Sequence, residues 1–284
     1  MDGRVLRFAA FTDDSAGGNP AGVVLDAPGL DGAGMLRIAA EVGYSETAFV
    51  IDGDTGRRRY RLRYFSPRGE VAFCGHATIA TAVALAHRDG PGRLVFDTAA
   101  GAVPVTVAGW GGVTRATLTS VPTRSRPAAP ADVAAALAAL RWAPGDIDGM
   151  DARFPPHVAF AGNDHLMLAA ATRQRLADLD YDVPALGALM GRAGWTTVHL
   201  FWAERADRFH ARDPFPVGGV AEDPATGSAA AAFGGYLRAL GRVTGPTRLT
   251  IRQGEDLGRP GELTVDVDPA DARVRVTGQA VPIG

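Results

Sequence analysis

The chain's single cysteine, Cys74, stands in the stretch FCGHATIATA at residues 73–82, directly before a glycine and a histidine. A thiol beside an imidazole is the pairing that activates cysteine nucleophiles and bases. A second loop, EDPATGSA at residues 222–229, has a similar form but no sulfur. Cys74 is therefore either a reactive thiol or a packing residue beside a site whose chemistry belongs to other residues.

Both loops lead into helices rich in small residues, which begin at Gly75 and Gly227. The start of a helix has free backbone N–H groups and the positive end of the helix dipole, so it binds carboxylates and phosphates. The alternative is that the Gly, Ser and Thr residues only cap the helices. For either loop alone we favour capping, whereas the matched pair favours a site for a small anion.

Polar side chains differ between the two loops, with His76 opposite Ser228 and Asp223 just before the second helix. A lone histidine is more often structural than catalytic, but the helix dipole at this place disfavours the protonated ring. We therefore expect His76 to be a neutral hydrogen-bonding partner. Asp223 is either an ordinary N-cap or a group that receives a substrate ammonium or hydroxyl.

A glutamate breaks the similarity of a second pair of segments. GYSETAFV at residues 43–50 has Glu46 where GWTTVHLF at residues 194–201 has Thr197. Glu46 enters an otherwise apolar strand, and burial there raises the pKa of a carboxyl toward the range of a general acid or base. A solvated glutamate at a strand edge is an equally good interpretation of the sequence.

These pairs belong to a repeat that extends along the chain. Gly43 and Gly194, each between a helix and a strand, are 151 residues apart, and Gly75 and Gly227 are 152 apart. A third pair, RLVFDT and RLTIRQ, recurs in the same order. Three pairs at nearly one offset indicate duplication into two related lobes. Residues 123–146 form the predicted junction and contain one Ala-rich helix.

The helix that follows each glycine pair is apolar on nearly every face, so it must be surrounded by protein. Short strands precede and follow it. We therefore predict an α+β fold with two lobes, each a β-barrel wrapped around a central apolar helix, and a site in the cleft between them. The first lobe is expected at residues 1–125 and the second, with the linker helix, at residues 126–271.

The composition and the absence of certain sequence motifs argue against several classes of function. The net charge of −2 with intermixed signs gives no basic face for nucleic acid, and the chain has no apolar run of the ~20 residues that span a membrane. One cysteine and an acidic N-terminal stretch without a signal-peptide pattern lead us to expect a cytoplasmic protein. We find no GxGxxG, phosphate-binding loop, HxH or HExxH motif, so no nucleotide cofactor and no metal is predicted.

Five ordered motifs resemble those of the PhzF-like phenazine-biosynthesis proteins, which belong to the superfamily of diaminopimelate epimerases and proline racemases. The motifs are FTDDSAGGNPAGVV (11–24), GYSETAFV (43–50), YFSPRGEVAFCGHAT (64–78), EDPATGSAAAAFGGYL (222–237) and IRQGEDLGRPGEL (251–263). The resemblance implies two barrels with central helices, a site in the interlobe cleft, a homodimer, and a C-terminal strand at residues 272–284 that returns to the first lobe.

For the chemistry, the resemblance implies a proton shift within a small carboxylate such as a dihydro-hydroxyanthranilate, without metal or organic cofactor. The matching residues are Glu46 as acid and base, with His76 and Asp223 as further polar residues of the catalytic site. The residues matched to substrate binding are Ser45, Gly75, Gly227, Ser228, Asn19 and Gln253.

The sister racemases use two cysteines as a paired acid and base, and only Cys74 is present here. A two-thiol racemase is therefore excluded within one chain, and Cys74 is interpreted as a packing residue. The leading hypothesis is a cofactor-independent isomerase. The alternatives are a non-catalytic or regulatory carboxylate-binding protein on the same fold and a one-cysteine epimerase or dehydratase.

Overall fold

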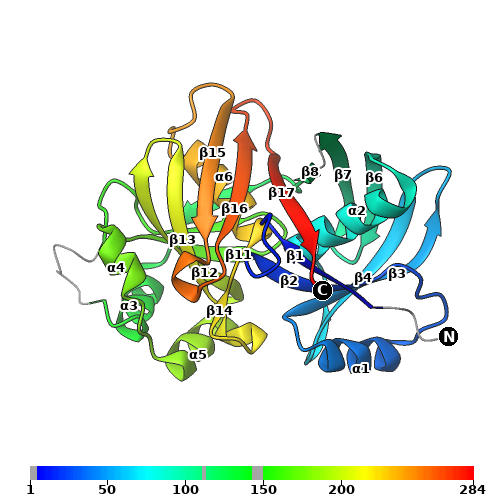
Figure 1. The fold of residues 1–284 in the computed structure, drawn as a ribbon. Coiled ribbons are helices and arrows are strands. Elements are labelled where there is room, and N and C mark those ends of the chain that lie inside the picture. The colour runs from blue at the N-terminus through cyan, green and yellow to red at the C-terminus, as the bar shows by residue number, and fades with distance from the viewer. Residues whose placement is uncertain (1–4, 111–112, 143–149) are drawn as a thin grey trace.

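The computed structural model describes residues 5–110, 113–142 and 150–284. Its strands form one continuous network of 17, which curves into two lobes joined by the C-terminal strand β17 (Val274–Pro282). Figure 1 shows the two lobes side by side, with β17 in red between them. The predicted α+β fold of two similar lobes is confirmed.

The first lobe is a closed barrel around helix α2 (Gly75–Asp89). Its strands pair in a ring, and β17 closes the ring by pairing with both the last strand and the first. The strands in ring order are β1 (Leu6–Ala10), β2 (Asn19–Val24), β3 (Glu46–Asp54), β4 (Arg59–Ser66), β6 (Gly92–Thr98), β7 (Gly101–Trp110) and β8 (Val113–Thr119). A short strand, β5 (Gly69–Val71), extends the edge of β4.

The second lobe repeats this plan around helix α6 (Gly227–Ala239). Its strands are β9 (Arg124–Pro127), β10 (His157–Phe160), β11 (Asp164–Ala169), β12 (Trp195–Arg205), β13 (Arg208–Pro214), β15 (Thr247–Gln253) and β16 (Gly261–Val267), with β14 (Glu222–Asp223) on the edge of β13. Among the described residues this sheet has no ladder between β9 and β17. The segment between β8 and β9 lies along that seam, where Ser120 N donates to Val274 O (2.9 Å) and Thr123 N to Ala272 O (2.8 Å).

Both central helices are buried on all sides, as their composition predicts. Every residue of α2 from Gly75 to Ala86 and of α6 from Gly227 to Leu237 is buried. Their small side chains allow the surrounding strands to approach closely, which is why a helix can occupy the interior of so narrow a sheet.

The outer helices α1 (Gly32–Val42) and α5 (Val183–Ala193) have the same position and the same caps in the two lobes. Asp31 and Asp182 accept a hydrogen bond from the third residue of their helix, at 2.8 and 2.9 Å. Each helix ends at a glycine with a φ of 73°, a left-handed conformation that favours glycine. The chain then enters β3 or β12, which is the helix, glycine and strand unit predicted from the repeat.

The predicted junction contains β9 and α3 (Pro130–Ala139), and α3 packs against α5 of the second lobe. The end of that segment, from residue 143, lies outside the described residues. Three shorter helices occur in the second lobe: α4 (Arg173–Ala177), η1 (Pro216–Gly218) and η2 (Glu255–Leu257).

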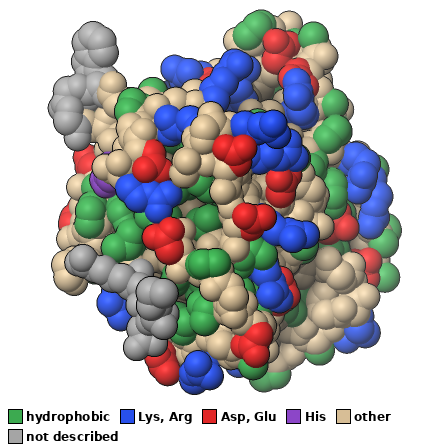
Figure 2. Space-filling view, turned by 90° about the vertical axis from the view of Figure 1, so that its right-hand side faces the viewer, with side chains coloured by type: hydrophobic (Ala, Val, Ile, Leu, Met, Phe, Trp, Pro, Cys, Tyr) green, Lys and Arg blue, Asp and Glu red, His purple; other side chains and the backbone are tan. Residues whose placement is uncertain are grey.

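The surface has charges of both signs. On the face in Figure 2, Arg side chains alternate with Asp and Glu, and no region of one sign stands out. Among the described helices none is both long and apolar enough to cross a membrane.

Candidate active site

The starts of α2 and α6 meet at the boundary between the lobes. A Cβ atom on Gly75 would lie 3.2 Å from Gly227 Cα and 3.3 Å from Ser228 N, so only glycine permits this approach of the two backbones. Neither Cys74 nor Thr226, the N-cap residues, caps its helix through its side chain. The interpretation of Thr226 as a side-chain cap is therefore wrong, and two helix N-termini converge at one point.

Glu46 begins β3 beside this point and is 6 % exposed. Its Oε2 lies 3.4 Å from His76 Nε2. Burial raises the pKa of Glu46, while hydrogen bonds from Ser45 and Cys74 lower it by less. The solvated-edge interpretation of Glu46 is thus wrong, and its carboxyl holds a proton more readily than that of an exposed glutamate.

His76 stands in the first turn of α2 and contacts three residues from two other places in the chain. Asn19 Nδ2 lies 3.0 Å from Nδ1, while Ser45 Oγ and Glu46 Oε2 each lie 3.4 Å from Nε2. Burial lowers the pKa of His76 to about 3, so the ring is neutral as predicted, although the cause is burial and not the helix dipole. With Asn19 donating to Nδ1, the ring proton is on Nε2 and faces Glu46.

Asp223 lies on β14 at 4 % exposure and accepts hydrogen bonds from Asn19 Nδ2 (2.7 Å) and Thr226 Oγ1 (2.6 Å). Burial and the negative charge of Glu46 raise the pKa of Asp223 well above its ordinary value. Its interpretation as an N-cap is wrong, since Thr226 occupies that position. Asn19 links Asp223 to His76 and thus joins the second lobe to the first.

Gln253, matched to substrate binding, uses its amide within the loop that carries Asp223. Its Oε1 accepts from Thr226 N (3.0 Å), and its Nε2 donates to Asp223 O (2.8 Å) and Thr226 Oγ1 (3.0 Å). Gln253 is 1 % exposed, and its hydrogen bonds hold this loop in place. Thr226 was not singled out from the sequence, although its place between Asp223 and Gly227 is a signal for a role in the loop.

Cys74 contacts the polar site directly, so its interpretation as a packing residue is incomplete. Its Sγ lies 3.3 Å from His76 Nδ1 and 3.7 Å from Nε2, and it hydrogen-bonds Glu46. Burial and the charge of Glu46 raise the pKa of the thiol well above its ordinary value, so Cys74 is a neutral donor. Donor atoms of Glu46, Cys74 and His76 lie within 4.8 Å of one another, close enough to hold a metal ion by distance alone. In the structure these atoms hydrogen-bond one another.

A small and largely apolar cavity of about 20 Å³ lies between the lobes, beside the start of α6. Ser228, which is buried, lines it together with Phe73 and Gly162. This volume is near that of one water molecule. Of the residues predicted for the site, only Ser228 lines this cavity.

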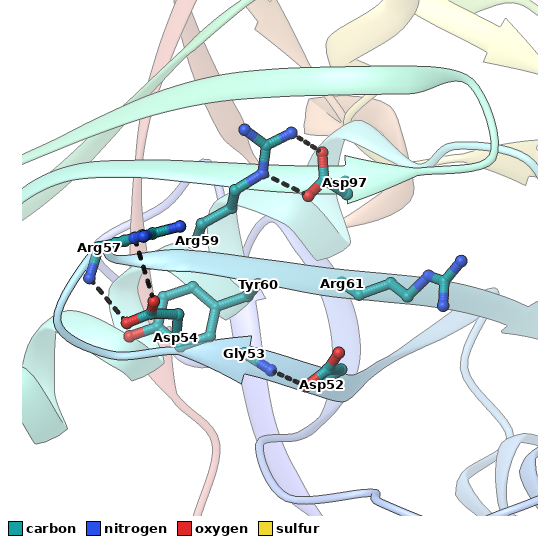
Figure 3. Close-up of a pocket in the computed structure, with 8 residues that line it drawn as sticks. All are labelled: Asp52, Gly53, Asp54, Arg57, Arg59, Tyr60, Arg61 and Asp97. Atoms are coloured by element: carbon teal, nitrogen blue, oxygen red, sulfur yellow. Dashed lines mark hydrogen bonds and ion pairs between the residues drawn. The ribbon is translucent and has the colours of Figure 1, made fainter.

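Figure 3 shows a wider surface hollow of about 450 Å³ at the far end of β3. Two of its three acidic groups form ion pairs, Asp97 with Arg59 (2.6 Å) and Asp54 with Arg57 (3.5 Å). Asp54 is eight residues along the strand from Glu46, or about 26 Å. The hollow is therefore separate from the polar site at the helix starts.

Comparisons with known proteins agree with this architecture. Residues 8–284 match the model of the PhzC-PhzF family, described as phenazine biosynthesis-like protein. An uncharacterised isomerase of Deinococcus radiodurans is 35 % identical over 99 % of this chain and 91 % of its own. The trans-2,3-dihydro-3-hydroxyanthranilate isomerase of Pseudomonas aeruginosa is 31 % identical over 95 % of this chain and 92 % of its own.

Among solved structures, a PhzF-family phenazine biosynthesis protein of Bacillus anthracis superposes with a TM-score of 0.85 at 25 % identity, covering 99 % of this chain and 96 % of its own. A hydroxyproline epimerase of Agrobacterium vitis shares the fold, with a TM-score of 0.65 at 15 % identity and coverage of 99 % and 90 %. The chain therefore belongs to the PhzC-PhzF family of phenazine biosynthesis-like proteins and is an enzyme of the isomerase class.

Proposed function

We propose that this enzyme moves a proton within a small conjugated carboxylate and that Glu46 carries the proton. The observation that supports this most directly is the position of Glu46, a buried carboxyl 3.4 Å from a neutral histidine where two helix N-termini meet. A dihydro-hydroxyanthranilate is the substrate that we propose, because a relative of 31 % identity is named for that reaction.

The starts of α2 and α6 suit the carboxylate of such a substrate. The N–H groups of Gly75 and Gly227 begin two helices whose dipoles both favour negative charge. Two converging helix ends balance about one elementary charge. A monocarboxylate therefore fits the electrostatics better than a phosphate ester or a dicarboxylate.

The proton transfer conserves atoms and charge. The Glu46 carboxylate takes a proton from one carbon, the C–H electron pair enters the conjugated system, and the resulting Glu46 acid returns the proton at another carbon. One C–H bond breaks and one forms, so no oxidant or reductant is required. A single group serves both steps best when its pKa lies near the working pH, the direction in which burial moves Glu46.

The test uses trans-2,3-dihydro-3-hydroxyanthranilate as the probe, followed by proton NMR in D₂O. Glu46→Gln should fold and reduce isomerisation by ~10²-fold or more. Glu41→Gln is the matched control, because Glu41 is an exposed glutamate on the neighbouring helix α1. Wild-type turnover by Glu46→Gln would contradict the proposal, as would failure of the wild type to isomerise or exchange the probe.

The contact of Cys74 with Glu46 and His76 favours a second candidate, a one-cysteine epimerase or dehydratase in which the thiol carries a proton. Cys74→Ser separates the two candidates, since Glu46 remains in place. Loss of isomerisation with retained folding favours the thiol mechanism, while activity that survives the change eliminates it. A non-catalytic carboxylate-binding protein would catalyse no deuterium exchange at all.

A further inference from the structure

A row of buried polar side chains crosses the sheet of the second lobe behind Asp223. His165 on β11, Thr197 and His199 on β12, and Asp213 on β13 are each exposed by 1 % or less. Burying polar and ionisable groups costs free energy unless they are hydrogen-bonded, so such a row needs a reason.

The hydrogen bonds of this row end at Asp213, which accepts from Thr197 and His199, while Thr197 accepts from His165. Thr197 Oγ1 donates to its Oδ1 (2.7 Å), and His199 Nδ1 lies 3.0 Å from its Oδ2. The hydroxyl proton of Thr197 is used in the hydrogen bond to Asp213. The Thr197 oxygen therefore accepts the hydrogen bond from His165 Nδ1, at 2.8 Å. Both imidazoles then have their proton on Nδ1, which agrees with the lack of a partner for either buried Nε2.

The first lobe shows that the fold itself does not require this row. Glu46 matches Thr197 in the repeat, and the β2–β3 ladder pairs Glu46 with Ala21 just as the β11–β12 ladder pairs Thr197 with His165. His199 therefore stands where the first lobe has Ala48.

Asp213 has an uncharged counterpart as well. Ala48 pairs with Tyr64, so Tyr64 holds the place of Asp213, and Tyr64 pairs with Val71 as Asp213 pairs with Asp223. The first lobe thus builds the same sheet without any of these ionisable groups.

Asp213 and Asp223 face each other across the β13–β14 ladder, both buried. Directly opposed residues of an antiparallel pair have their side chains on the same face, where two negative charges repel strongly. This repulsion favours a proton on one of the two carboxyls. Each aspartate accepts hydrogen bonds from two side chains, Asp213 from Thr197 and His199, and Asp223 from Asn19 and Thr226. The difference between them is that burial and the charge of Glu46 raise the pKa of Asp223, which favours the proton on that carboxyl.

The other charged and titratable groups nearby do not change which of the two aspartates is expected to hold the proton. Arg212 and Glu222, the residues adjacent to the two aspartates, form their own ion pair at 2.6 Å. His76, which reaches Asp223 through Asn19, is neutral, and burial lowers the pKa of His165 to about 3, so that ring is neutral too.

We propose that Asp213, held by Thr197 and His199, is a positioning residue that keeps a proton on Asp223, so that Asp223 faces the substrate as a neutral hydrogen-bond donor opposite Glu46. This inference rests on the proposed function for its catalytic consequence. The proton placement itself does not depend on the substrate.

The first test measures the tautomers of the histidines by side-chain ¹⁵N NMR, which needs no substrate. In the wild type, His165 and His199 should both have the Nδ1–H form. In Asp213→Asn the side-chain amide faces His199 Nδ1, so His199 should change to the Nε2–H form. Asp207→Asn removes the same charge from the exposed turn between β12 and β13 and should change neither ring. An Nε2–H form of either ring in the wild type overturns the proposal, even if Asp213→Asn fails to fold.

The second test follows the proton on Asp223. The infrared band of a protonated carboxyl should disappear in Asp223→Asn and also in Asp213→Asn. The upper limb of the kcat/KM profile should move about 1 to 3 pH units lower in Asp213→Asn, because loss of the neighbouring charge lets Asp223 ionise earlier. A folded Asp213→Asn protein with the wild-type band and profile overturns the proposal. If the probe is not turned over but the tautomers and the band behave as expected, the proposed function fails and this inference stands.

Discussion

The contact between the two helix starts predicts a large effect of a single methyl group. In Gly75→Ala the new Cβ would lie 3.2 Å from Gly227 Cα, 3.3 Å from Ser228 N and 3.4 Å from Gly227 C. All three atoms belong to the backbone, so no side chain can rotate away to make room. The helix starts must move apart by a few tenths of an ångström.

The expected change in the free energy of unfolding is the sum of two opposing terms. Overpacking of this kind costs ~1–3 kcal/mol. Replacing glycine by alanine inside a helix gains at most ~1 kcal/mol, and less at the first helical position. We therefore expect Gly75→Ala to lower the free energy of unfolding by up to ~3 kcal/mol. Because the variant displaces the N–H groups proposed to hold the substrate carboxylate, kcat/KM should fall more than stability does.

Urea unfolding and turnover of the anthranilate probe measure the two effects. Gly191→Ala is the matched control, since Gly191 lies in α5 with no atom within 4 Å of its added Cβ. That variant should gain up to ~1 kcal/mol in the free energy of unfolding and retain activity. If Gly75→Ala were stabilised equally and remained fully active, the close approach of the two helices would be refuted.

Two further changes test the buried charges. Burial raises the pKa of Glu46 above that in the unfolded chain, so the folded protein loses stability as pH rises from the unfolded pKa through the raised value. In that pH range the free energy of unfolding of Glu46→Gln should therefore increase relative to that of the wild type, by up to ~1.4 kcal/mol per pH unit. A difference between the two proteins that does not depend on pH would contradict the raised pKa of Glu46. Arg212→Met leaves Glu222 buried without its partner and should cost ~3 kcal/mol or more in urea unfolding, whereas Arg59→Met at the exposed pair with Asp97 should change little. Equal effects of the two arginine variants would show that the Arg212 pair is open to solvent.

The features that the sequence predicts are those encoded over short distances along the chain. Each helix, glycine and strand unit has its own cap and its own left-handed glycine, at Gly43 and Gly194, so both could be found by comparing the two halves. The burial of the two central helices could be predicted because neither has a polar face. Glu46 could be singled out because the matched residue, Thr197, provides an internal reference.

Features that depend on the pairing of distant strands could not be found in this way. Cys74 meets Glu46 only because α2 starts beside β3, and a cysteine in an apolar stretch has no pattern that distinguishes a contact from packing. The row behind Asp223 requires the registers of β11, β12 and β13, and a shift of one residue would turn each side chain to the other face. The seam of the second lobe likewise depends on where β17 returns.

The duplicated halves also explain why the site is asymmetric. Two identical lobes would present the same groups to the cleft twice, and two glutamates facing one small acid would repel it and each other. In the structure the first lobe has Glu46 where the second has Thr197, and the second has Asp223 where the first has Val71, four residues before the helix glycine in each case. The symmetric parts, the helix starts at Gly75 and Gly227, suit the symmetric task of holding a carboxylate. A proton shift needs a proton-carrying group on one side of the substrate only, and Glu46, the residue proposed for that task, is one of the residues that break the repeat.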